Sequence, residues 1–318
     1  MKKTERVVLY YDLKITASSR TFDGPAPISV KKAISLMELV PKEHRAMRRA
    51  RGSQTIYISD WQRHGNTVKI LINKSDKSLA DPVFSVPTKS SRRVARKRSD
   101  EGQDFSSHVV IKFPQDTASP ALMLVEQCPG LNAIVIADLF RRVLRLAKDI
   151  SPKDFQQIHP DGSLDSDGLP LKYSVFYGAE LDGHLSPTFV EDLNRGEMRT
   201  VELITNKKTR NDFDTTGYLV EDKASIVLKV SPTALRPADV ATHVLNFVKG
   251  KSKDFSLAKI RFKEPDSSNE RTVTIDPDVG VAENYVKRDL LTNFEQLLES
   301  SYASLHDEII KKMLYLAR

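Results

Sequence analysis

Residues 256–263, Ser-Leu-Ala-Lys-Ile-Arg-Phe-Lys, decide how we interpret the chain. Side chains alternate between the two sides of a β-strand, so this stretch should have one apolar and one cationic face. The apolar members are Ala258, Ile260 and Phe262, and the cationic members are Lys259, Arg261 and Lys263. Two interpretations follow: a surface for the phosphates of a nucleic acid, or a solvated edge strand that uses lysine to discourage pairing with other chains.

The composition favours a globular protein with acidic partners. The 318 residues suffice for one large domain or two modest ones. The 49 Lys and Arg outnumber the 42 Asp and Glu by 7. Cys128 is the only cysteine, so one chain can form neither an internal disulfide nor a thiolate metal cluster. With no signal-peptide pattern and no run of about 18 apolar residues, we expect a cytoplasmic protein.

The hydrophobic patterns predict an α+β fold of mixed or antiparallel sheets with packed helices. Strands are expected at 7–15, 55–59, 67–72, 108–113, 121–125, 225–230 and 270–275, and helices at 29–40, 139–150 and 238–248. From about residue 282 to 316, apolar residues recur every three or four positions, which predicts one long C-terminal helix used for core packing or as a dimer seam. Residues 151–171 are rich in Pro, Gly, Asp and Ser and suggest a domain boundary.

Two further segments are strongly basic. The predicted helix at 139–150, with Asp138 as its cap, carries Arg141, Arg142, Arg145 and Lys148 opposite its apolar side. The tract between residues 89 and 98 is either a flexible arm on phosphates or a loop that stays solvated, and we favour the arm because the whole chain is basic. Its cations are Lys89, Arg92, Arg93, Arg96, Lys97 and Arg98.

Common catalytic motifs are missing from the sequence. It contains no phosphate-binding GxxxxGK[ST], no GxGxxG after a strand and no GxSxG, and its seven histidines have no metal-ligand spacing. We therefore expect no catalytic residues, metal or cofactor. The alternative is a Mg²⁺-dependent nuclease, since Asp214, Glu221 and Lys223 loosely imitate the acidic pair and lysine of such enzymes. A charged strand end would give the same pattern.

Four short motifs are arranged along the chain in a familiar order. They are Ile72-Asn-Lys-Ser-Asp-Lys-Ser-Leu79, Leu122-Met-Leu-Val-Glu126, Ile226-Val-Leu-Lys229, and Phe255-Ser256 followed by Arg261-Phe-Lys263. In order and spacing the chain resembles the RexA-like proteins of the lambda-type Rex system, by which a resident prophage aborts infection by other phages. The resemblance runs through nearly the whole chain and is poor at about 151–224.

The resemblance implies a homodimer that binds double-stranded DNA with little sequence preference and signals to a RexB-like membrane channel protein. It also implies a globular α+β lobe, here residues 1–150 and 225–318, and a mobile central lobe, here 151–224. A fold relationship to the RdgC recombination-associated proteins is implied as well. In the family, the arginine and lysine of an arginine-x-lysine pair contribute to DNA binding, and they fall on Arg261 and Lys263.

We therefore expect a non-enzymatic, DNA-binding homodimer that acts as the intracellular sensor of a phage-exclusion system. Arg261, Lys263 and Lys259 should contact phosphates, and Lys229 is a weaker candidate on the neighbouring strand. The rival functions are the nuclease and a protein-protein adaptor whose basic face is incidental. The sequence does not predict whether the protein binds DNA or RNA.

Overall fold

The structure is a computed structural model that describes residues 1–116, 119–164, 166–195, 197–205, 224–229, 240–251, 254–263, 270–276, 280–281 and 285–318. Over these residues the fold is α+β, with five α-helices. The chain forms two compact units, the first made of Met1–Leu181 with Asp289–Arg318 and the second of Asp182–Arg288. Among the described residues, no helix has the length and apolar character needed to cross a bilayer.

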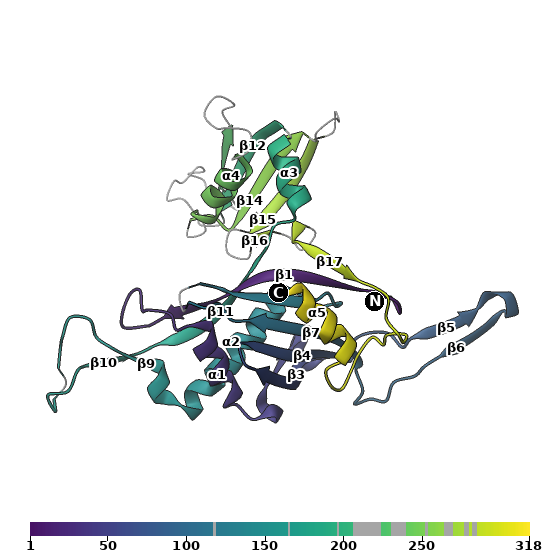
Figure 1. Cartoon of the computed structure of the whole chain (residues 1–318), viewed down its shortest axis with the longest axis horizontal. Coiled ribbons are helices and arrows are strands. Elements are labelled where there is room, and N and C mark those ends of the chain that lie inside the picture. Colours follow the sequence, from purple (N-terminus) through teal and green to yellow (C-terminus); the bar gives the residue numbers. More distant parts are fainter. Residues whose placement is uncertain are drawn as a thin grey trace, which may run out of the picture. The chain divides into compact units, whose positions relative to one another are not determined.

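A large, curled antiparallel sheet dominates the first unit and forms a half-barrel (Figure 1). Its strand order is β11-β1-β8-β7-β4-β3-β2, and β17 also pairs with β1. The strands are β1 (Arg6–Ser18), β2 (Ala46–Arg49), β3 (Gln54–His64), β4 (Thr67–Asp76), β7 (Gln103–Lys112), β8 (Ala121–Glu126), β11 (Phe176–Gly183) and β17 (Arg288–Leu291). Two separate two-stranded sheets pair β5 (Val83–Val86) with β6 (Ser91–Val94), and β9 (Gln156–Ile158) with β10 (Lys172–Ser174).

Helices α1 (Val30–Glu38) and α2 (Ala133–Ile150) pack against each other. The Ser29 side chain caps α1 by accepting the Lys32 N–H at 3.2 Å, as the sequence predicts. Helix α2 begins earlier than predicted, because Asn132 accepts the Val135 N–H at 3.0 Å. Asp138, the predicted cap, therefore lies inside the helix.

The predicted long C-terminal helix is wrong. The chain forms β17, then an irregular segment, and then the ten-residue helix α5 (Asp307–Leu316). Leu291, Leu298 and Met313 are nevertheless buried in one cluster with side chains of β1, β7 and β8. The spacing of three and four thus reflects contact with the sheet. Backbone groups of the irregular segment bond to distant parts of the chain: the Leu298 N–H donates to the Lys3 carbonyl at 2.8 Å, and the Ser300 carbonyl accepts the Ser106 N–H of β7 at 3.1 Å.

The second unit is a five-stranded antiparallel sheet with two helices. The strand order is β13-β12-β14-β15-β16, and the helices α3 (Pro187–Arg195) and α4 (Val240–Lys249) supply side chains to its core (Figure 1). The strands are β12 (Glu197–Thr205), β13 (Ala224–Lys229), β14 (Leu257–Lys263), β15 (Glu270–Asp276) and β16 (Gly280–Val281). The predicted central lobe of 151–224 overlaps this unit only in part, since β13, β14 and β15 also belong to it. Its mobility stays a prediction.

Candidate nucleic-acid interface

Strand β14 is the third of the five strands and has two chemically different faces. Ala258 and Ile260 are 0% exposed and Phe262 is 1% exposed, and all three belong to the core that α3 and α4 cover. Their neighbours Lys259, Arg261 and Lys263 alternate with them and therefore point to the other side of the sheet. Arg261 is exposed, and the two lysines are partly exposed.

Strand pairing brings a fourth cation onto the same side. Thr200 of β12 pairs with Arg261 on one side and with Lys229 of β13 on the other, and paired residues share a face of a sheet. Lys229 is exposed. We call this side of the sheet, with Lys229, Lys259, Arg261 and Lys263, the basic face.

The basic face spans a distance suited to several phosphates. At about 3.3 Å per residue, Lys259 and Lys263 lie roughly 13 Å apart along β14, and at about 4.8 Å per strand Lys229 and Arg261 lie roughly 10 Å apart across the sheet. Three threonines flank the cations: Thr272 pairs with Arg261, Thr274 pairs with Lys259, and Thr200 lies between Arg261 and Lys229. Their hydroxyls can donate hydrogen bonds to an anion.

The charge of this face is net positive. Glu202 pairs with Lys259, and both Glu197 and Glu270 pair with Lys263, so three acidic residues accompany the four cations. Within the part of the chain that the structure describes, none of the four cations lies within ion-pair distance of a carboxylate.

The four cations are predicted from the sequence and the three threonines are not. The prediction that Lys229 lies on the strand next to β14 is wrong, because β12 lies between β13 and β14. The cations follow from the two-residue period of β14 and from the motif that ends at Lys229. Thr272 and Thr274 alternate with buried Val273 and Ile275 in β15, and this pattern indicates which side of the strand they occupy. The strand register determines which cation each threonine lies beside, and the local sequence pattern does not predict this register.

The second predicted basic tract forms a β-hairpin with a short extension. Arg92 and Arg93 lie on β6 and are exposed, and the Arg93 guanidinium lies 4.8 Å from the centre of the Phe84 ring on β5. The extension is fixed at Lys97, whose backbone N–H donates to Asp81 at 3.2 Å. Arg96 and Arg98 are exposed.

The residues of the nuclease alternative, Asp214, Glu221 and Lys223, lie outside the described residues. Over the part of the chain that is described, no three or more His, Cys, Asp or Glu side chains are grouped to hold a metal ion.

The chain matches no protein-family model, no curated protein and no solved structure. The resemblance to RexA-like proteins accordingly stays a prediction, and the geometry of the basic face carries the functional argument.

Proposed function

We propose that the protein binds double-stranded DNA, with little sequence preference, through the basic face. The observation that carries the proposal is that Lys259 and Arg261 project from β14, whose opposite side is buried in an apolar core, and that Lys229 of β13 is exposed on the same side of the sheet. A rigid strand presents its cations at fixed intervals, so they can contact phosphates without first ordering a flexible segment.

The polar partners on this face fit phosphate contacts. Guanidinium and ammonium groups, together with threonine hydroxyls, are common donors to phosphate oxygens. Such contacts fix position and supply affinity, but they carry no base information. Binding should therefore be similar on unrelated sequences and should weaken as salt rises.

The same face favours a duplex over a single strand. Proteins that bind single strands use aromatic side chains on which the bases stack. Among the described residues of β12–β15, the aromatic side chain of Phe262 lies in the core, and the basic face carries none. The face thus offers phosphate contacts without a stacking platform.

The biological role that we propose comes from the resemblance. The motif order supports a non-enzymatic homodimer that acts as the intracellular sensor of a phage-exclusion system, with a RexB-like membrane channel protein as partner. The hairpin β5–β6 is a second candidate contact for DNA because Arg92 and Arg93 are exposed on it.

A binding experiment on two unrelated duplexes tests the DNA-binding proposal. We expect the double variant Arg261→Ala/Lys263→Ala to bind both duplexes more weakly, and by a similar factor. The matched control is Arg195→Ala, which removes an exposed cation from α3, a helix that packs on the core side of the sheet. If the double variant binds like the wild type, the basic face is not the site.

Further experiments distinguish the proposed function from its rivals. Plasmid incubated with the protein and Mg²⁺ should remain intact, and cleavage would favour the nuclease. Failure of the wild type to bind any duplex at low salt would favour the adaptor. A competition with duplex RNA then determines whether DNA is the preferred partner, and preference for RNA would overturn that part of the proposal.

A further inference from the structure

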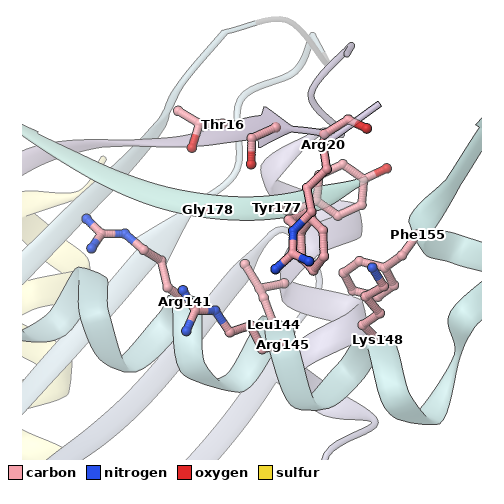
Figure 2. A pocket seen from close by; sticks show the side chains of 12 residues that line it. Thr16, Arg20, Arg141, Leu144, Arg145, Lys148, Phe155, Tyr177 and Gly178 are labelled. Carbon is pink, nitrogen blue, oxygen red and sulfur yellow. The ribbon is translucent and has the colours of Figure 1, made fainter. Parts of the chain in front are cut away.

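The first unit contains a cavity that the proposed DNA contacts do not use. Its volume is about 640 Å³, and it lies between the end of β1, the segment that follows it, helix α2 and the beginning of β11 (Figure 2). Its lining residues include hydroxyl, cationic and aromatic side chains. A volume of 300–1,000 Å³ is typical of sites for small molecules.

Four cations line this cavity. Arg141, Arg145 and Lys148 lie on one face of α2, since they follow each other at spacings of four and three residues. Arg20 reaches toward them from the opposite wall, and Figure 2 shows its guanidinium inside the space they enclose. No Asp or Glu is among the described residues that line the cavity.

Charges near the rim only partly balance these cations. Asp138 pairs with Arg141, and Asp149 follows Lys148 on α2. Partial burial and the nearby charge of Arg20 lower the pKa of Lys148, with Asp149 opposing that effect. The cations are therefore close enough to repel each other, and a bound polyanion would relieve that repulsion.

Two of the cationic groups, those of Lys148 and Arg141, are held in place before any ligand binds. The Lys148 ammonium donates to the Ser174 hydroxyl at 2.6 Å and lies 3.6 Å from the centre of the Phe176 ring. Arg141 donates to the Ala179 carbonyl at 3.2 Å. Binding would then cost less side-chain entropy than it would with mobile cations.

Gly178 keeps the wall between β1 and β11 free of a side chain. A Cβ atom at this position would lie 2.6 Å from the Thr16 hydroxyl oxygen and 4.0 Å from Arg141. The remaining lining includes the hydroxyl side chains of Thr16, Ser18 and Ser19 and the apolar or aromatic side chains of Leu144, Phe155, Phe176 and Tyr177. The cavity therefore combines a cationic side with an aromatic side.

We propose that this cavity binds a small molecule that carries two or more phosphate groups. Arginine guanidinium groups donate two parallel hydrogen bonds to phosphate oxygens, and the ammonium of Lys148 adds a point charge. The aromatic wall can contact an apolar part of the ligand, such as a nucleoside. A nucleoside triphosphate and an inorganic polyphosphate share the required chemistry.

Calorimetric titration of the full chain tests the proposal with ATP, tripolyphosphate and adenosine. Both phosphate compounds should bind, and adenosine should not. If ATP binds more tightly than tripolyphosphate, the aromatic wall contacts the nucleoside and the ligand is a nucleoside triphosphate. If the two bind with equal affinity, the ligand is an inorganic polyphosphate. Absence of binding by both phosphate compounds at low salt would overturn the proposal.

Variants of the cavity-lining cations, with a control on α2, provide a matched comparison. Arg20→Ala and Arg145→Ala remove exposed cations that line the cavity and should each weaken binding tenfold or more, since each loses charge-assisted hydrogen bonds. Arg142→Ala removes an exposed cation of the same helix that does not line the cavity, and it should leave the affinity unchanged. If Arg142→Ala weakens binding as much as Arg145→Ala, the attraction is diffuse and the site is refuted.

Discussion

Replacing Glu126 by Gln should strongly destabilise the first unit, because Glu126 is the centre of a buried charged network. One carboxylate oxygen lies 2.6 Å from Arg6 Nε, and the other lies 2.6 Å from His108 Nδ1 and accepts the His108 backbone N–H at 3.0 Å. All three side chains are at most 2% exposed. His108 Nε2 accepts the His306 N–H at 3.0 Å, so the ring proton lies on Nδ1 and points to Glu126.

The size of the effect follows from this geometry. One oxygen of Glu126 accepts hydrogen bonds from His108 and the other forms an ion pair with Arg6, whereas Gln is uncharged, has one oxygen and would place an NH₂ group against one of these donors. The buried guanidinium of Arg6 would also lose its counter-charge. Removing one partner of a buried ion pair lowers the free energy of unfolding by about 3–5 kcal/mol. This is a large part of the roughly 5–15 kcal/mol by which a typical domain is stable.

Urea unfolding followed by the fluorescence of Trp61 measures this loss. Trp61 is the only tryptophan and lies in the first unit, so its signal reports on that unit. The control is Glu101→Gln, whose partner Arg98 lies at 3.9 Å with 85% of its side chain exposed, and it should cost less than about 1 kcal/mol. The reasoning is refuted if Glu126→Gln lowers the free energy of unfolding by less than about 1 kcal/mol while the dependence of that free energy on urea concentration is unchanged.

Three further predictions concern other parts of the chain. Burial and the charge of Glu126 raise the pKa of the Cys128 thiol to about 12, so a thiol reagent near pH 8 should modify it only after unfolding; rapid reaction of the native protein would contradict this. The ordinary pKa of a thiol is 9.0, so between about pH 9 and 12 the thiol stays protonated in the folded protein and ionises in the unfolded chain. The stability that the protonated thiol contributes is therefore complete below pH 9 and is lost as the pH rises toward 12. Asn293 has a φ of 58°, so Asn293→Val should cost about 1–2 kcal/mol in thermal unfolding and Asn293→Gly should not; equal losses would argue against a strained backbone. Replacing the exposed Arg92 and Arg93 by Ala should change stability by less than about 0.5 kcal/mol yet weaken duplex binding, and unchanged affinity would exclude the hairpin as a contact.

The sequence predicts structure well where the deciding interactions are local. The alternation of Ile260 and Arg261 follows from the geometry of a single strand, and the Ser29 cap follows from the residues beside it. The C-terminal segment is predicted wrongly because an irregular chain lying on a sheet can bury every third or fourth residue, as Leu291 and Leu298 show. Its backbone partners, such as Lys3 and Ser106, lie far away in sequence, which a local pattern cannot reveal.

Sites assembled from distant segments were the hardest to predict. The helical pattern predicts that the α2 cations share one side of the helix, but Arg20 joins them only through the packing of β1 and β11 against that helix. The network of Arg6, His108 and Glu126 likewise combines three separate strands. For such groups the sequence gives the residue types, and the fold determines which of them meet.

The salt dependence of duplex binding tests most directly whether the basic face contacts phosphates. Four contacts predict a slope of about −3.6 for the logarithm of affinity against the logarithm of salt concentration, since each contributes about −0.9. Arg261→Ala/Lys263→Ala should reduce the slope to about −1.8 and lower affinity on the order of 50-fold at about 0.1 M salt. The same slope for the double variant and the wild type would contradict the account.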